Sequence, residues 1–247
     1  MMKNTHMARL LFLTCLLQLT CSVFAEVIPE SFGHGMVSFG NYQPKEPKSL
    51  ADIPLPVLER LTEHLKRRLG GVQYANLKFA GGQLIDAKEL RRTEPNSKNY
   101  KWEIPAYILH FDLELPGTPK LIFPAEIWLR SDASTIREIN LPAYANSTDK
   151  QVFHSFKELM STIARKGFLE KNMAYELEYN EDGTIVKKGL FEKNMTVRLE
   201  YNEKFDTLAW EFTKTVSDDG YTKEMKSISV NAYSGKIIKT WKSRAIR

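Results

Sequence analysis

Three ionisable residues at alternate positions, His110, Asp112 and Glu114, have the types and the spacing that could do chemistry. They lie in an alternating segment, where every second side chain points to the same face of a strand, about 7 Å from the next. Such a row can supply two ligands to a metal ion, or an acid–base pair. The other histidines stand in no ligand spacing to this row. We therefore expect a solvated outer face opposite an apolar row, with no metal and no other cofactor.

A second group of carboxylates, Glu176, Glu178 and Glu200, lies with Arg198 on the polar faces of two later alternating segments. A glycosidase needs two carboxylates whose surroundings separate their pKa values, and nothing in the local sequence does this. Cross-strand charge pairing explains these residues better. No serine-hydrolase, zinc-protease, phosphate-loop or dinucleotide-binding motif occurs. We therefore expect a protein that is not an enzyme.

Basic residues gather at the C-terminal end, where no acidic residue interrupts them. They are Lys236, Lys239, Lys242, Arg244 and Arg247, and Trp241 stands among them. Such a segment can bind an anionic lipid or a polysaccharide through charge and an aromatic anchor. The alternative is a solvated end with no partner.

Aromatic residues form a further candidate surface, composed of Tyr100, Trp102, Tyr107, Phe123, Trp128 and Tyr144. They can line a concave sheet that receives a peptide or an apolar ligand, or they can pack between a sheet and a helix. We take Trp102, Tyr107 and Trp128, together with the basic C-terminal residues, as the candidate binding surface.

Two amphipathic helices must position these residues. Leucines recur at helical spacing between Pro54 and Leu69, and the glycine pair Gly70–Gly71 is typical of a helix end. A second apolar stripe with the same spacing runs over 153–163 and ends at Gly167.

Alternating patterns follow each helix and predict antiparallel strands. After the first helix we expect about five, beginning near Val72, with a hairpin at Gly81–Gly82, a strand over 83–90 and a polar loop over 91–101. The longest alternating run, 107–115, follows this loop.

After the second helix, a segment at 166–173 is closely repeated at 188–195, and each copy leads into a strand-like run. Two copies are too few for a solenoid. We interpret the repeat as a duplicated hairpin that enlarges one sheet.

The order of helix, glycine and antiparallel strands thus occurs twice. It predicts an α+β fold of two tandem modules, each one amphipathic helix packed on a curled antiparallel β-sheet. We place an extended leader at 26–49, the first module at 50–141, a linker at 142–152 and the second module at 153–247.

The end of the second module resembles a known family. Residues 228–238 read Ile-Ser-Val-Asn-Ala-Tyr-Ser-Gly-Lys-Ile-Ile and follow a helix, a glycine and a hairpin. This order is similar to the PepSY domain over about 153–241, although this chain has extra strands between Phe191 and Thr215. The resemblance implies a small helix on a curled antiparallel sheet, without catalytic residues. It also implies a cell-envelope setting, often as an inhibitory or regulatory segment of an exported peptidase.

The first 25 residues have the pattern of a secretory signal, with a basic start, an apolar run and Ala25 at the cleavage position. Met7 would serve as a start as well as Met1. Both cysteines, Cys15 and Cys21, fall within this segment, so we expect a mature chain without disulfides. The residues before Cys21 fit lipoprotein attachment poorly. We expect an exported protein, periplasmic or extracellular, with no transmembrane span in the mature chain.

The charge balance limits the partners. The formal net charge is +5, and removal of the signal takes away two basic residues and no acidic one. This near-neutral balance argues against nucleic acid. We therefore expect a non-catalytic cell-envelope protein that binds a protein or peptide, in the role of a peptidase regulator or inhibitor. The alternatives are a carrier of an apolar or anionic ligand on a concave sheet face and, third, a metal-dependent hydrolase that uses His110 and Asp112.

Overall fold

The computed structural model describes residues 34–115, 121–145, 147–150, 152–168, 177–179, 184–187 and 195–246. The predicted signal sequence lies outside these residues. The first elements are η1 (Leu50–Asp52), α2 (Leu55–Ala75), β1 (Leu77–Leu84), α3 (Ala87–Thr93), η2 (Pro95–Asn99), β2 (Tyr107–Leu115), β3 (Leu121–Leu129) and β4 (Thr135–Arg137). They are followed by α4 (Phe156–Arg165), β5 (Leu177–Tyr179), β6 (Thr184–Lys187), β7 (Met195–Asn202), η3 (Glu203–Phe205), β8 (Thr207–Asp218), β9 (Thr222–Asn231) and β10 (Ile237–Ile246).

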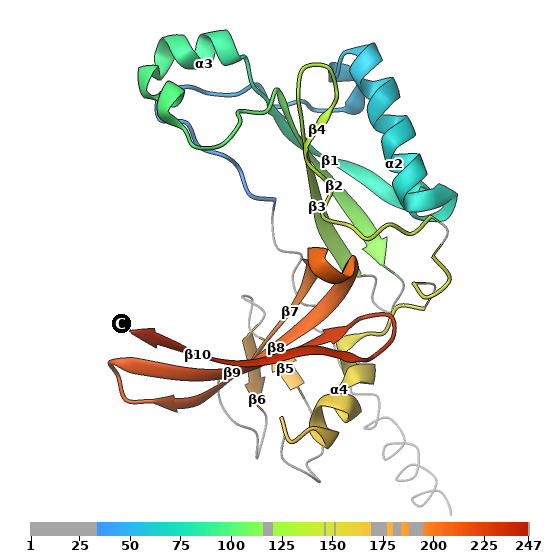
Figure 1. Cartoon of the computed structure of the whole chain (residues 1–247), viewed down its shortest axis with the longest axis vertical. Helices are drawn as coiled ribbons and strands as arrows, with labels where there is room; N and C mark the ends of the chain where they lie inside the picture. The colour runs from blue at the N-terminus through green and yellow to red at the C-terminus, as the bar shows by residue number, and fades with distance from the viewer. Residues whose placement is uncertain are drawn as a thin grey trace, which may run out of the picture.

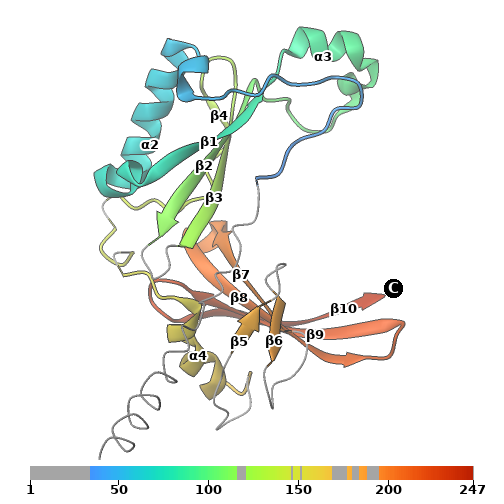
Figure 2. The ribbon, with the colours of Figure 1, turned by 180° about the vertical axis from the view of Figure 1, so that it is seen from behind.

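The described residues form an α+β fold with two antiparallel sheets (Figure 1). A four-stranded sheet has the order β1-β2-β3-β4, and a six-stranded sheet has the order β10-β9-β8-β7-β6-β5. Helix α2 lies beside the four-stranded sheet and α4 beside the six-stranded sheet (Figure 2). In the part of the chain that the structure describes, no helix is both long and apolar enough to cross a membrane.

The first predicted helix is confirmed up to Leu69, and a second helical segment follows it within α2. Leu61, Leu65 and Leu69 are buried, as their helical spacing predicts. Gly70 interrupts the helix with a left-handed φ of 72°, after which the chain regains helical geometry to Ala75. The expectation of a strand near Val72 is therefore wrong, because a second helical segment follows the kink at Gly70.

The hairpin expected at Gly81–Gly82 is also wrong. Both glycines lie within β1, where the pairing with β2 shifts register between Phe79 and Gly81. A Cβ atom on Gly82 would lie 2.2 Å from the carbonyl oxygen of Ile108. The glycine pair therefore permits a bulge and a close approach of two strands, and does not form a turn.

The strand expected over 83–90 and the polar loop expected over 91–101 are replaced by β1, α3 and η2. The side chain of Asp86 accepts hydrogen bonds from the amides of Lys88 (2.8 Å) and Glu89 (3.2 Å), so that α3 begins directly after it. Leu90 anchors this short helix in the interior, with 0% exposure. The described part of the first half therefore has four strands, where about five were expected.

Both faces of the four-stranded sheet are packed near the start of β2. The main hydrophobic cluster joins leucines of α2 to one face through Leu109 and Phe111. A smaller cluster on the other face includes Phe39, Tyr42 and Ile108. The described part of the predicted leader therefore packs across the sheet face opposite α2.

The second predicted helix is confirmed as α4. Ser155 and Glu158 form a capping box at its start, and Gly167 follows its end with a left-handed φ of 68°. The repeated segments, 166–173 and 188–195, lie largely outside the described residues. The duplicated hairpin therefore stays a prediction.

The segment expected as a linker, 142–152, has packed members. The ring of Tyr144 is buried against Tyr233 of the β9–β10 turn, with ring centroids 6.0 Å apart and an interplanar angle of 79°. The two hydroxyl groups are also hydrogen-bonded. Burial raises the pKa of both tyrosines, so both stay protonated in the neutral pH range.

Candidate functional site

The solvated outer face expected for His110 is wrong for this residue. Its side chain is buried, and the residue has only 2% exposure. The imidazole stacks on that of His34, with ring centroids 4.7 Å apart and planes 7° from parallel. Residues 34–45 pack against this face of the sheet, which the periodicity of β2 alone does not reveal.

The three candidate metal ligands do not converge on one point. Asp112 Oδ1 lies 2.9 Å from His34 Nε2, and Glu114 forms an ion pair with Lys78. His110 Nε2 lies 3.2 Å from Glu126 Oε2 without forming a hydrogen bond. Among the residues that the structure describes, no group of three or more His, Cys, Asp and Glu side chains could hold a metal ion.

Glu126 is the acid nearest to His110, and its neighbours favour its ionised form. Burial raises the pKa of Glu126. This effect is outweighed by His110, by a 2.6 Å hydrogen bond from the Trp128 indole and by the charge of Arg137, all of which lower the pKa. The pKa of Glu126 is therefore below its usual value. A carboxylate held in this way acts as a structural acceptor and does not serve as a general acid near neutral pH.

The candidate aromatic surface is divided between two faces of the four-stranded sheet. Tyr107 packs against the main core cluster, whereas Trp128 packs against the smaller cluster on the opposite face. The ring centroid of Trp102 lies 5.8 Å from that of Trp128 and 5.3 Å from that of Tyr100, on which Trp102 stacks. Arg137 lies over Trp128, 3.9 Å from its ring centroid. Trp102 and Trp128 therefore belong to one aromatic cluster that excludes Tyr107.

An open depression of about 870 Å³ lies between the leader, the start of α3 and the segment before β2. Its carboxylates already have structural roles. Asp86 caps α3, Asp52 accepts from the amides of Lys48 and Ser49, and Glu103 makes two 2.7 Å bonds to Arg130. The carboxylates named here are therefore already engaged within the protein.

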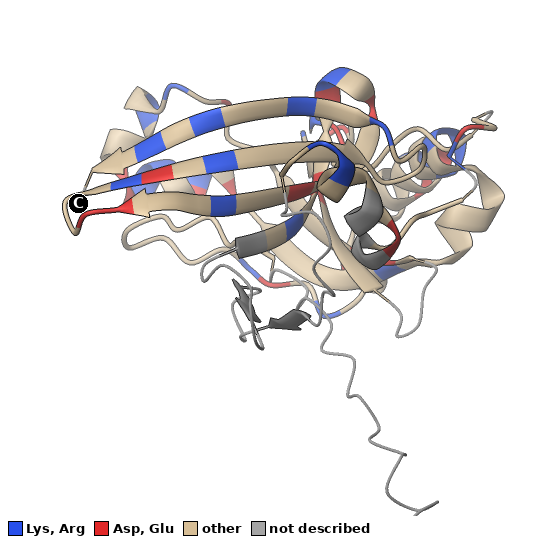
Figure 3. Cartoon of the chain, turned by 90° about the horizontal axis from the view of Figure 1, so that it is seen from below, with Lys and Arg blue, Asp and Glu red and all other residues tan. Residues whose placement is uncertain are grey.

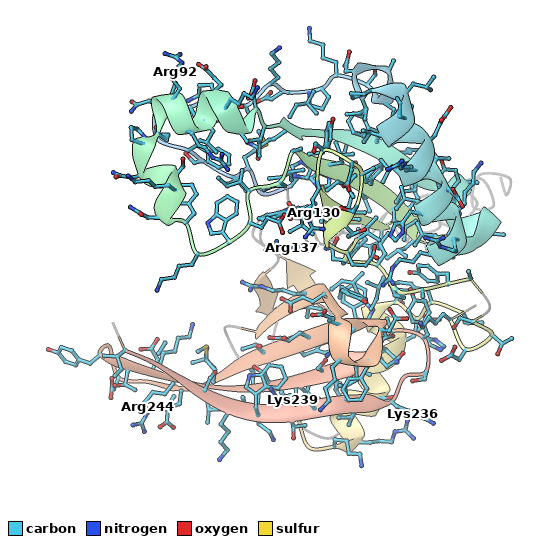
Figure 4. All side chains as sticks on the ribbon, turned by 45° about the horizontal axis from the view of Figure 1, so that its top comes forward. Arg92, Arg130, Arg137, Lys236, Lys239 and Arg244 are labelled. Carbon is cyan, nitrogen blue, oxygen red and sulfur yellow. The ribbon has the colours of Figure 1, made fainter. Side chains whose placement is uncertain are left out.

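The basic C-terminal segment is a regular strand, β10, and not an irregular tail. Figure 4 shows Lys236 at the turn that precedes β10, Lys239 along the strand and Arg244 near its far end, whereas Arg130 and Arg137 belong to the other sheet. Residues 239–246 pair continuously with 222–229 of β9. The strand is the terminal member of the six-stranded sheet.

The candidate residues of β10 are distributed over its two faces. Trp241 lies opposite Ser227, and Lys239 opposite Ser229. The Lys239 ammonium lies 4.8 Å from the Trp241 ring centroid. Lys242 and Arg244 occupy the other face, because successive side chains of a strand point to opposite sides. The single basic patch expected from the sequence is therefore two patches.

Lys239 and Trp241 share a face of the sheet with polar residues of β8 and β9. The hydroxyl groups of Thr213 and Ser227 lie 2.7 Å apart. Glu211 lies opposite Ser229, and burial, with the nearby charge of Glu200, raises its pKa.

The face that carries Lys242 contains a row of three lysines in register. Lys242 lies opposite Lys226 of β9, which lies opposite Lys214 of β8. The ammonium groups of Lys214 and Lys226 lie 5.7 and 5.9 Å from the ring centroid of buried Phe168. Figure 3 shows basic positions recurring along neighbouring strands of this sheet. The sequence gives no direct signal for the row, because its members are brought together by strand register.

The edge formed by β10 is the longest sheet edge in the described residues that carries no bulge in its middle. At the opposite end of its sheet, β5 has three residues, and β4, which ends the other sheet, also has three. The β1 edge has a bulge at Gly81 and pairs with Lys45 at Leu84. The ten residues of β10 have one register shift, at its start, between Ile237 and Lys239.

The chain matches no known protein family, and neither a curated protein nor a solved structure matches it. A function can therefore be proposed only from the geometry of the described residues.

Proposed function

We propose that this protein binds an extended segment of another polypeptide, which adds to the six-stranded sheet as a further strand beside β10. The observation that carries this proposal is the regular edge at residues 237–246, which pairs with β9 on one side only within the described residues. The free side of such a strand presents alternate N–H and C=O groups, which an extended chain can match with main-chain hydrogen bonds.

The composition of β10 favours a partner over self-association. Proteins blunt unused edges with short strands, prolines, central bulges or charges. β10 has ten residues and no proline, so charge is the only one of these features that it has. Lysines disfavour pairing with a second basic strand but do not disfavour an acidic or neutral one.

The proposed setting of this edge is an exported protein of the cell envelope. We propose two tandem helix-plus-sheet modules, of which the second resembles PepSY and regulates a peptidase or another envelope protein through the bound segment. In support, α4 is followed by Gly167 and then by antiparallel strands, and the β9–β10 turn contains Gly235 with a left-handed φ of 65°.

A carrier of an apolar or anionic ligand on a concave sheet face has less support. Both faces of the four-stranded sheet are packed around Ile108 and Leu109. The face with Trp241 is lined by Thr213, Ser227 and Ser229, whose hydroxyl groups suit an apolar ligand poorly.

Strand addition is tested with eight-residue peptides in which valine alternates with threonine or with glutamate. Each peptide is also made with its backbone amides N-methylated at either the odd or the even residues. We expect binding that protects from hydrogen exchange those amides of 237–246 that face away from β9. One N-methylated set should abolish this binding and the other should preserve it, because only alternate amides face the edge.

The proposal is overturned if no peptide protects β10. It is equally overturned if both N-methylated sets bind without protecting β10, since that result would mean recognition through side chains alone.

A further inference from the structure

We infer that the segment added to β10 is acidic, and that one of its carboxylates lies opposite Lys242. This inference rests on the proposed strand addition and identifies the chemistry of the partner. It is carried by the in-register row of Lys214, Lys226 and Lys242 on three adjacent strands.

Lysines directly opposite one another are an unfavourable arrangement in a sheet. Their Cβ atoms are about 4.5–5.5 Å apart, and like charges at this separation destabilise the pairing. In this row Lys226 and Lys242 form such a pair at the edge of the sheet, and Lys214 extends the row on β8. An added strand would place its own residue next in the same row, so an acid there would turn the end of the row into an attractive pair.

The two lysines at the interior end of the row, Lys214 and Lys226, are stabilised by an aromatic ring of the protein. The ring of Phe168 faces both Lys214 and Lys226, and an aromatic ring attracts cations through its face. Lys242 is exposed and forms the outer end of the row, on the strand that the partner would join. The partner's carboxylate is therefore expected at Lys242.

The next basic residue on the same face does not call for a second acid. Arg244 donates a 2.6 Å hydrogen bond to Glu224 of β9, its direct cross-strand neighbour. The carboxylate of Glu224 therefore neutralises the charge of Arg244 within the sheet. Glu224 also lies within electrostatic reach of Lys242, but it accepts its hydrogen bond from Arg244, so an acid of the added strand is expected at the one position beside Lys242.

The opposite face of β10 calls for a different kind of side chain. Trp241 presents an aromatic surface, and Lys239 lies over its ring. A residue with apolar surface packs well against a cross-strand aromatic neighbour. The partner is thus an extended segment with acidic and apolar residues in alternation. A second copy of β10 does not fit, because β10 contains no acidic residue.

The test compares three peptides in which valine alternates with glutamate, glutamine or lysine. Binding is measured at low and at physiological salt to the wild-type protein, to Lys242→Met and to Lys239→Met. The last variant is the matched control, because it removes the same charge from the same strand on the other face. Circular dichroism verifies that both variants are folded.

We expect the glutamate peptide to bind about tenfold more tightly than the glutamine peptide at low salt, and less so at physiological salt. Lys242→Met should weaken binding of the glutamate peptide about threefold, as for an exposed ion pair, whereas Lys239→Met should change it less than twofold. In Lys242→Glu, the preference should shift toward the lysine peptide.

The inference is overturned if the glutamate and glutamine peptides bind equally well, or if the two methionine variants weaken binding equally. Strand addition itself would survive either result. Failure of every peptide to protect β10 would instead remove the proposed function. Anionic phospholipid vesicles that bind the protein in a Lys242-dependent way and exclude the peptide would assign the lysine row to a lipid surface, and would also overturn the inference.

Discussion

The guanidinium group of Arg68, in α2, lies 3.2 Å from the carboxylate of Asp206, in the turn between β7 and β8. This contact joins the helix beside one sheet to a turn of the other. Asp206 also accepts a 2.7 Å hydrogen bond from Lys150 and a 3.1 Å hydrogen bond from the amide of Ala143. One carboxylate therefore joins α2, the segment between the sheets and the six-stranded sheet.

Two replacements of Asp206 should separate the contribution of its charge from that of its hydrogen bonds and backbone conformation. Asp206→Asn keeps a residue type that tolerates the observed left-handed φ of 44°, and should lower the free energy of unfolding by about 1 kcal/mol. Asp206→Ala also loses that tolerance and the oxygen that accepts from the Ala143 amide, and should lower the free energy of unfolding by roughly 1–2 kcal/mol more. Urea denaturation of both variants measures the two steps. Equal stability of the two variants would contradict the assignment.

The contribution of Asp206 should depend on pH. Burial raises the pKa of Asp206, but hydrogen bonds from Lys150, Tyr201 and the Ala143 amide lower it by more than burial raises it. The pKa in the folded protein is therefore below the ordinary value of 3.8. A carboxylate with a lowered pKa stabilises the fold above its unfolded pKa and loses this effect as the pH falls through its folded pKa. We expect the stability difference between the wild type and Asp206→Asn to be constant above about pH 5 and to shrink below about pH 4. Unfolding measured from pH 7 to pH 2 checks this, and an undiminished difference at pH 2 would contradict it.

The two adjacent glycines of β1 should respond very differently to the same substitution. A Cβ atom on Gly82 would lie 2.2 Å from the backbone oxygen of Ile108, whereas a Cβ atom on Gly81 meets nothing within 4 Å. Gly82→Ala should therefore destabilise the protein by about 2 kcal/mol more than Gly81→Ala, because the β1–β2 backbones must separate. Thermal unfolding of both variants tests this. Because Gly81→Ala is itself strained at a φ of 125°, similar melting temperatures would mean that the contact at Gly82 costs no more than this backbone strain.

These glycines also show which parts of the fold could be predicted from the sequence. Local periodicity predicted the leucine face of α2, the helix at α4 and the strand over 107–115, because burial of one face imposes the spacing directly. A glycine pair does not distinguish a turn from a close backbone approach, since both need a missing side chain. The glycine pair therefore predicted a hairpin at Gly81–Gly82, where the structure has a continuous strand with a bulge. It also missed α3, whose start depends on a capping side chain, Asp86.

The candidate site could be predicted only in part, for the same physical reason. The basic composition of the C-terminal segment was visible in the sequence, and its edge position and division into two faces were not. The lysine row depends on the register of β8, β9 and β10, which aligns Lys214 with two residues far along the chain. The His34–His110 stack likewise joins residues of the leader and of β2. Contacts between distant segments leave no periodic signal in a single sequence.

The attachment of residues 34–45 to the four-stranded sheet should depend on one buried amide side chain. Gln83 has 2% exposure, accepts a 2.9 Å hydrogen bond from the Val37 amide and donates a 2.9 Å hydrogen bond to the Val37 carbonyl. Gln83→Met keeps the side-chain length but leaves both backbone groups of Val37 without this partner. The expected loss is about 1–3 kcal/mol, which should appear first as faster hydrogen exchange in 37–45.

A matched control for this change is Gln43→Met, in the same segment at an exposed position. It should change the free energy of unfolding by less than about 0.5 kcal/mol and leave the exchange of 37–45 as it is in the wild type. Because Phe39 and Tyr42 also anchor the segment, Gln83→Met should loosen it without unfolding the sheet. Amides of β2 should therefore keep their protection. Faster exchange in β2 to the same degree would mean that the segment and the sheet unfold as one unit.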